Sequence, residues 1–433
     1  MWERLREMAR SWLGADAEPP RAPVDESVRR YERAEDGITA AIAGKLAMLT
    51  FADSTFAVAQ ANGDTPSPRT ALIERALKPL WQRDAEWITA QALGKGGMLL
   101  VPSVTASGGV QIQAVDQNRL VALEERGGQL TRAVLAADEC EQRGRRYCLL
   151  ASYELAPGGA QRIRYRAFSD AGAQAPLTAF AAWKDLTPEI DIADTDRLLL
   201  AHLKCPRDNR TTDRLIGVPI TYGAEKLIEE LNEHARIYRR EFKLTRPMLG
   251  LDSSLWRDVP AAGDIRQLRR TVQDSDDPFV PFPAPTMSAG ATWQYFAPDI
   301  RAEAMETRWN SLCRRLEKAC GLSQGILTER PTMSYANRDE VRAAQYDTFA
   351  VVRAIRTAWE QALEDLAYAV DVLAERFALT EPGDGGGYAL SFDWDLSMIE
   401  STSQTFEQLA ELHARGGCTL EELRQWVMGK PGA

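Results

Sequence analysis

Residues 215–244 read LIGVPITYGAEKLIEELNEHARIYRREFKL and carry a long helical pattern. The apolar residues recur at steps of three and four, which places them on one face of an α-helix. They are Ile220, Ala224, Leu227, Leu231, Ala235, Tyr238 and Phe242. The other face is acidic at its start and basic at its end, which suits the helix dipole and equally suits copies packed side by side. Pro247 ends the helix, because proline disfavours helical geometry in the preceding residue.

Two further helices show the same spacing. The first is predicted over 299–320, with Asp299 as its N-cap and Gly321 as its stop, and its stripe is Ala302, Met305, Trp309, Leu312, Leu316 and Ala319. The second is predicted over about 338–377, where Asn337 and Glu340 form a capping box. Its stripe is Val352, Ile355, Trp359, Leu363, Leu366, Val370, Leu373 and Phe377. A stripe of about seven turns is longer than most compact domains place on one helix.

The segments between these helices lack helical periodicity. Residues 247–298 are rich in proline, which argues against a regular core element there. Residues 320–340 read CGLSQGILTERPTMSYANRDE, a polar stretch with no evident nucleophile, metal ligand or phosphate cradle. The polar stretch therefore predicts a loop joining two helices.

The rest of the chain falls into helical and β-rich parts. The first residues, MWERLREMARSWLGAD, are predicted to form a short amphipathic helix, and the Pro-rich 15–27 predicts a tether after it. Helices are expected at about 27–48 and 68–95. Apolar alternation and Gly-Gly turns over 96–200 predict an antiparallel meander of about five or six strands. The C-terminal part predicts a strand at YALSFDWDL and then a helical hairpin.

Composition narrows the class of protein. The hydrophobic content of 45% is typical of a globular protein, and 433 residues are too many for one compact core, so two or more lobes are expected. The net charge of -10 provides no global basic field for nucleic acid. The six cysteines include no C-x-x-C pair and only three histidines occur, which disfavours zinc sites and disulfide frameworks. Neither a signal peptide nor a membrane-spanning run is recognisable. We therefore expect a soluble protein made in a reducing cytoplasm.

One cluster of carboxylates offers an enzymatic alternative. It consists of Glu189, Asp191, Asp194 and Asp196 in PEIDIADTD, and closely spaced oxygens of this kind suit Mg²⁺ or Ca²⁺. The same residues equally describe a solvated turn. No P-loop, G-x-S-x-G or H-E-x-x-H motif accompanies them, and His202 with Cys205 lacks a defined third group. The alternative is a metal-dependent phosphoesterase or nuclease; the sequence favours no catalytic residues, no metal and no cofactor.

The order of the elements carries a family resemblance. IGVPI at 216–220 leads into the first long helix, which ends in REFKL at 240–244. The run TWQYFAPDIRAEAMETRWNSLCRRLEKACGLS leads into the second, and SYANRDEV at 334–341 precedes the third. Together they resemble the portal, or head-to-tail connector, family of tailed bacteriophages, most of all the portals of long-tailed siphophages. The likeness is clear over about 215–378 and looser in the C-terminal hairpin.

The resemblance implies an α+β, predominantly helical fold in which twelve copies form a ring around a channel at one capsid vertex. The chain would then divide as follows: 1–215, N-terminal wing; 216–246, first stem helix; 247–298, clip; 299–320, second stem helix; 321–338, tunnel loop; 339–395, long helix and return strand of the wing; 396–433, helical crown.

The resemblance also assigns residues and partners. DNA-facing loop residues would be Thr328, Glu329, Arg330, Thr332, Ser334, Tyr335 and Asn337. Stem contacts would come from Leu227, Leu231, Tyr238, Met305, Trp309 and Leu312, and clip contacts from Trp256, Phe279 and Phe282. Implied partners are the terminase large subunit, a head–tail adaptor, capsid and scaffolding proteins, and double-stranded DNA passing without sequence specificity. The expected location is the virion, after assembly in the host cytoplasm, and a prophage-derived particle remains an alternative setting.

Overall fold

A computed structural model gives the arrangement of most of the chain. It describes residues 12, 25–33, 37–52, 54–61, 66–105, 108–126, 129–210, 216–244, 248–252, 279–282, 293–296, 299, 301–328, 338–381 and 387–394. The chain forms two compact units, one made of Met1–Tyr222 with Cys320–Ala433 and the other of Gly223–Ala319. Helices and antiparallel sheets both contribute, so the fold is α+β, as expected. None of the described helices is long and apolar enough to cross a membrane.

The first unit begins with short helices. They are α2 (Asp25–Glu32), α3 (Gly37–Phe51), α4 (Pro68–Pro79), the π-helical turn η1 (Leu80–Asp84) and α5 (Ala85–Lys95). The Ser67 hydroxyl caps α4 by accepting a hydrogen bond from the Thr70 backbone N–H. Gly96 ends α5 in the left-handed conformation, with φ of 99°, which glycine adopts without a steric penalty. Helices therefore occupy both regions where the sequence predicted them.

A six-stranded antiparallel sheet over 120–192 confirms the later part of the predicted meander, whereas the strands before residue 120 belong to a separate sheet. Its strands are β4 (Leu120–Arg126), β5 (Gln129–Gln142), β6 (Arg145–Leu155), β7 (Gln161–Ser169), β8 (Gln174–Ala175) and β9 (Glu189–Ile192). The order is β4-β5-β6-β7-β8, and β9 also pairs with β7. Arg143 and Gly144 both have positive φ in the two-residue turn between β5 and β6, which matches the twist of the hairpin.

Two smaller sheets tie distant parts of this unit together. One has the order β10-β2-β3, from β2 (Gly97–Val104), β3 (Val110–Asp116) and β10 (Ala201–Lys204). The other pairs β1 (Thr55–Gln60) antiparallel with β14 (Tyr388–Asp393). The sequence predicted β14 but not β1, so the structure adds the strand that completes the pair.

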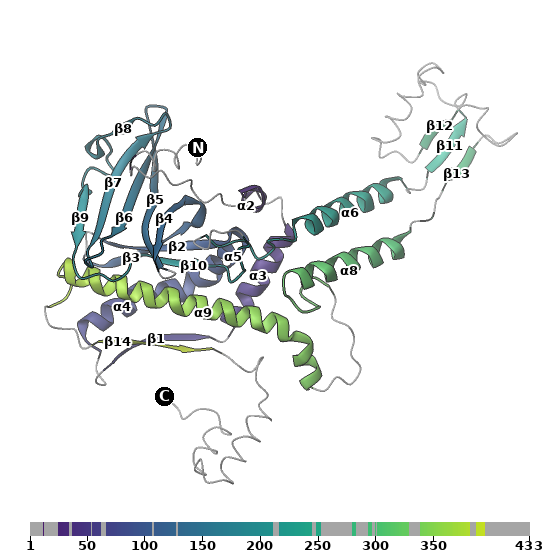
Figure 1. The fold of residues 1–433 in the computed structure, drawn as a ribbon. Coiled ribbons are helices and arrows are strands. Elements are labelled where there is room, and N and C mark those ends of the chain that lie inside the picture. The colour runs from purple at the N-terminus through teal and green to yellow at the C-terminus, as the bar shows by residue number, and fades with distance from the viewer. Residues whose placement is uncertain are drawn as a thin grey trace, which may run out of the picture. The chain divides into compact units, whose positions relative to one another are not determined.

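The long helix α9 (Arg338–Arg376) crosses the first unit, where it contacts β2, β10, α3 and α4 (Figure 1). Trp359 is fully buried and donates its Nε1–H to the Thr89 Oγ1 at 2.7 Å. The predicted stripe is buried from Val352 to Leu373. Phe377 was predicted to extend the stripe but is 45% exposed, because the helix ends one residue before it.

The second unit consists of α6 (Glu225–Leu244), α8 (Ala302–Ala319) and a small sheet (Figure 1). Its strands β11 (Met248–Asp252), β12 (Phe279–Phe282) and β13 (Trp293–Phe296) have the order β12-β11-β13. Part of the proline-rich insert therefore forms a sheet of short strands, which the sequence did not predict. Pro281 is accommodated because β12 is an edge strand, where a missing N–H leaves no ladder bond unmade.

The bounds of the two helices also differ from those predicted. Helix α6 begins at Glu225, because Pro219 and Gly223, with φ of 83°, interrupt the backbone before it. Helix α8 begins at Ala302, three residues after the predicted Asp299. Gly321 has φ of 71° just beyond α8, which confirms it as the helix stop.

Candidate functional site

The contact between α6 and α8 centres on His234, which is 4% exposed. Its Nε2–H donates to the Met305 carbonyl at 2.9 Å, so the ring links the two helices. Tyr238 stacks on the imidazole at 6.5 Å between centroids, and Trp309 lies 6.3 Å away. Arg301 pairs with Glu241 at 3.1 Å further along. Residues of increasing number on α6 thus meet residues of decreasing number on α8, as in an antiparallel pair.

The predicted stem residues lie on these two helices. Leu231 and Leu312 are buried in the described structure, and Leu227, Tyr238, Met305 and Trp309 are half-buried. Towards the C-terminus of α6, Phe242 is 45% exposed and Ile237 is 43% exposed. The apolar stripe of α6 is therefore buried in its first half, whereas apolar side chains remain exposed in the second half of the helix. The sequence does not single out His234, because a lone histidine among charged residues belongs to no recognisable motif.

The segment before α6 is held by a close crossing of two glycines. Gly217 approaches Gly96 so tightly that a Cβ on Gly217 would lie 2.0 Å from the Gly96 carbonyl oxygen. Gln117 binds both polar groups of Gly217, because its Oε1 accepts from the Gly217 N–H and its Nε2 donates to the Gly217 carbonyl, each at 2.9 Å. The His202 Nε2–H donates to the same Oε1 at 2.8 Å. This crossing fixes the IGVPI segment in the first unit.

The start of the predicted tunnel loop is anchored to α9. Ser323 and Thr348 exchange hydrogen bonds, each backbone N–H donating to the other residue's hydroxyl, at 2.9 and 3.2 Å. Thr328 is half-buried and its Oγ1 accepts from the Gly325 N–H at 3.3 Å. The other predicted loop residues lie outside the described residues: Glu329, Arg330, Thr332, Ser334, Tyr335 and Asn337.

The predicted clip residues are only partly placed. Phe279 and Phe282 are the two ends of β12, whereas Trp256 lies outside the described residues, as does the predicted crown over 396–433.

The acidic cluster of 189–196 forms ion pairs with arginines. The Arg162 guanidinium contacts Asp191 at 2.7 Å and Glu189 at 3.1 Å. The hydrogen bond from Arg162 lowers the pKa of Asp191 below its ordinary value. Asp196 contacts Arg197 at 3.0 Å instead. Three of the four carboxylates therefore pair with arginines, two with Arg162 and one with Arg197. In the described part of the chain, no three acidic, histidine or cysteine side chains lie together as metal ligands.

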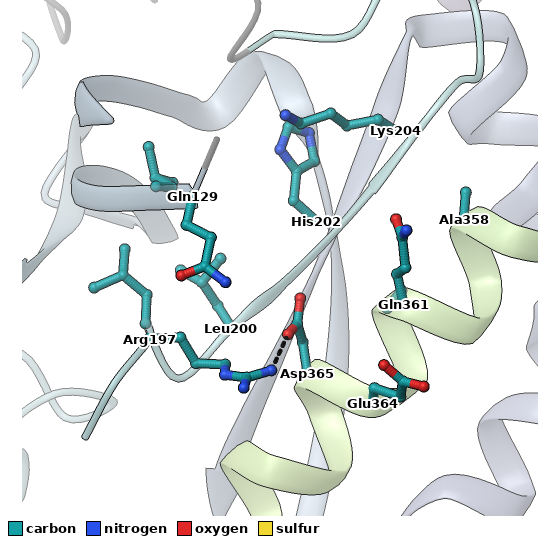
Figure 2. Close-up of a pocket in the computed structure, with 12 residues that line it drawn as sticks. Gln129, Arg197, Leu200, His202, Lys204, Ala358, Gln361, Glu364 and Asp365 are labelled. Atoms are coloured by element: carbon teal, nitrogen blue, oxygen red, sulfur yellow. Dashed lines mark hydrogen bonds and ion pairs between the residues drawn. The ribbon is translucent and has the colours of Figure 1, made fainter. Parts of the chain in front are cut away.

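A cavity of about 410 Å³ lies between β5, β10 and α9 (Figure 2). Arg197 on its wall pairs with Asp365 of α9 at 3.0 Å. Burial raises the pKa of Asp365, and the bond from Arg197 opposes that shift. Burial lowers the pKa of His202, also on the wall, to about 3, so its ring is neutral at physiological pH. The cavity thus carries charges of both signs around a neutral histidine, which suits a structural network better than acid–base chemistry.

Comparisons with known proteins find matches among solved structures but not among family models or curated proteins. No family model matches the chain, and no curated protein matches it. Among solved structures, a chain of the "Virion of native gene transfer agent (GTA) particle" has a TM-score of 0.48 at 14% identity, covering 98% of this chain and 99% of that one. A chain of the "Neck of native GTA particle computed with C12 symmetry" gives 0.47 at 12%, covering 99% and 100%. A chain of the "Neck of empty GTA particle computed with C6 symmetry" gives 0.46 at 14%, covering 98% of each. All three TM-scores lie below 0.5.

Proposed function

We propose that this chain is the subunit of a portal, a ring-shaped channel at one vertex of a phage-like particle through which double-stranded DNA is packaged and ejected. The observation that carries the proposal is the order of elements from 216 to 376. A helix, a β insert and a returning helix form one compact unit, and a loop then leads into a helix of 39 residues. This is the order of stem, clip, stem, tunnel loop and long helix in the siphophage-like portals that the sequence resembles.

The exposed charges of the helix pair support assembly into a ring. On α6 exposed Glu230 comes early and exposed Arg239 late, whereas on α8 exposed Glu306 comes early and exposed Arg315 late. Because the helices are antiparallel, the acidic half of α6 lies level with the basic half of α8. An α8 from a neighbouring copy would meet opposite charges along the outer face of α6, which favours a repeated side-by-side contact. The subunit number of twelve comes from the resemblance alone.

The charge balance supports a channel through which DNA slides. Each phosphate that a protein neutralises adds affinity by releasing counterions, and such affinity would slow translocation. Twelve copies at -10 give a formal charge on the order of -120, which disfavours gripping. Five of the seven predicted DNA-facing loop residues are polar and uncharged, in keeping with this role, whereas Glu329 and Arg330 carry charge.

The remaining surfaces then take defined partners. The clip, 247–298, would dock the terminase large subunit during packaging and a head–tail adaptor afterwards. The wing would contact the major capsid and scaffolding proteins. The proposal includes no catalytic step. The ion pairs of Arg162 with two of the four carboxylates that would hold the metal disfavour the phosphoesterase alternative.

Deleting 326–335 tests the function assigned to the loop. The deletion variant and a control that replaces the same residues with a Gly/Ser linker are expressed in a producing strain that lacks the wild-type chain. We expect both variants to oligomerise as the wild type does, and the deletion to reduce nuclease-protected DNA in particles. Loss of the oligomer in both variants would show that the loop serves packing, and normal DNA content in the deletion would contradict a channel-lining role.

A further inference from the structure

The six-stranded sheet is apolar on both faces. Along β5, Ala133 and Leu135 belong to one buried cluster, and the intervening Val134 and Ala136 belong to another. Strand β6 repeats the alternation, with Ala151 in the first cluster and the pair Cys148 and Leu150 in the second. Neighbouring residues on a strand point to opposite faces, so both faces need a cover.

The first face is covered by the long helix. Ala369 and Leu373 of α9 belong to the same cluster as Ala133, Leu135 and Ala151. The second face is formed by Val121, Val134, Ala136, Cys148, Leu150 and Phe168, and we call these residues the outer patch. All six are at most 9% exposed, so something covers them. Among the residues that the structure describes, the partly buried hydrophobic side chain packed on the outer patch is Trp12, which lies more than a hundred residues away in the sequence.

Two specific contacts seat the indole of Trp12. Its ring lies 6.1 Å from that of Phe168, at an interplanar angle of 54°. The Arg166 guanidinium lies 5.9 Å from the indole centroid, within the range of a cation–π contact. Aromatic pairs and cation–π contacts both add to the stabilisation that burial of the ring provides. Trp12 is therefore held by ring geometry and charge as well as by apolar area.

The sequence around Trp12 matches an apolar surface. Trp2, Leu5, Met8 and Trp12 are spaced by three, three and four residues, which places them on one face of a helix. The residues between them are mostly charged. A Pro-rich segment, 15–24, then connects this stripe to α2. Amphipathic helices with such a stripe commonly dock in apolar grooves.

We propose that residues 1–14 act as a separable docking segment, which Trp12 anchors on the outer patch so that this face of the sheet is shielded. The segment acts as a ligand that is part of the same chain: 15–24 tether it, and the indole of Trp12 holds it on the outer patch. Removing the indole of Trp12 exposes the outer patch, while the sheet stays folded and its other face stays covered by α9. This assignment does not depend on the portal function.

Two cysteines of the first unit provide the test in the full-length chain. Cys148 lies in the outer patch, opposite Phe168 in the strand register, and Cys205 lies outside it. Both are 4% exposed, and burial raises the pKa of each thiol to about 12, so the two start from similar reactivity. Alkylation by iodoacetamide is followed by peptide mass spectrometry in the wild type and in Trp12→Ala. Trp87→Ala is the control, because Trp87 is 55% exposed on α5.

We expect Trp12→Ala to increase the alkylation rate of Cys148 by about tenfold, from the combined loss of the ring pair and the cation–π contact. Cys205 should be unaffected, and Trp87→Ala should change neither thiol. An unchanged Cys148 rate in Trp12→Ala would overturn the proposal. Equal increases at Cys148 and Cys205 would also overturn it, because they would mean that Trp12 supports the whole unit.

A peptide added in trans tests separability directly. A chain lacking residues 1–20 is mixed with a synthetic peptide of those residues, and alkylation of Cys148 is measured again. The peptide should restore protection of Cys148, and the same peptide with alanine in place of Trp12 should not. Protection by both peptides, or by neither while Cys205 stays protected, would contradict docking through the indole.

Discussion

Substituting Gly217 by alanine should destabilise the first unit, because the glycine crossing leaves no room for a side chain. A Cβ there would lie 2.0 Å from the Gly96 carbonyl oxygen and 3.1 Å from its carbonyl carbon. These are backbone atoms at the end of α5, so a side-chain rotation cannot relieve the clash. The crossing must open, and the two hydrogen bonds between Gln117 and Gly217 are strained or lost with it.

The expected loss of stability is the sum of two costs, the overpacking at the crossing and the loss of the hydrogen bonds to Gln117. Overpacking a tight site costs about 1–3 kcal/mol. Each buried hydrogen bond contributes about 1 kcal/mol, and an orphaned buried amide costs more. We therefore expect Gly217→Ala to lower the free energy of unfolding by about 3–5 kcal/mol.

Urea denaturation followed by tryptophan fluorescence measures this loss. The matched control is Gly158→Ala, because a Cβ on Gly158 meets no atom within 4 Å. The control should shift stability by less than about 0.5 kcal/mol. A wild-type unfolding midpoint in Gly217→Ala, or an equal loss in the control, would refute the role of the crossing.

Three further predictions concern single side chains. Trp359→Phe should lower the free energy of unfolding by about 1–3 kcal/mol, because it leaves the buried Thr89 hydroxyl without its indole donor; urea denaturation measures the loss. Arg162→Gln should raise the pKa of Asp191 towards its ordinary value, which NMR titration of the carboxyl detects. The folded-state pKa of His202, about 3, lies below the ordinary 6.5, so the unfolded chain binds the extra proton between those values. Stability should therefore fall as pH decreases from 6.5 towards 3, and His202→Gln should flatten that slope in urea midpoints measured across the range.

Much of the fold follows from local patterns. The steps of three and four along α9 predicted a buried stripe, and Val352 to Leu373 are buried. Alternation and paired glycines predicted the antiparallel meander, because period-two patterns and tight turns are encoded within a few residues. Gly321 was predicted as a helix stop for the same reason.

The misses come from features that depend on distant residues. Strand β1 was not predicted, because its partner β14 lies more than three hundred residues away. The sheet β12-β11-β13 forms from three strands separated by long segments, and their prolines obscured the pattern. The burial of His234 depends on a carbonyl of another helix, which no spacing rule reports.

The candidate site was predictable to a smaller extent. The residues that the resemblance assigned to the stem lie on α6 and α8, which helical periodicity predicted, and their role in a stem stays a prediction. The anchoring of IGVPI through Gln117 was not predictable, because it needs two glycines that are far apart in sequence to cross. The acidic cluster was ambiguous in sequence. Only the structure shows that β7 pairs with β9 and so brings Arg162 of β7 next to Glu189 and Asp191 of β9.

Electron microscopy of the purified full-length chain, viewed down the particle axis, tests the channel most directly. We expect closed rings with a central opening wide enough for duplex DNA, and native mass spectrometry of the same sample should give one oligomer, with twelve copies implied by the family resemblance. The same species should persist across salt and protein concentrations that leave the fold intact. A folded chain that stays monomeric throughout that range, or that forms only open assemblies, would contradict the proposal that it is a portal subunit.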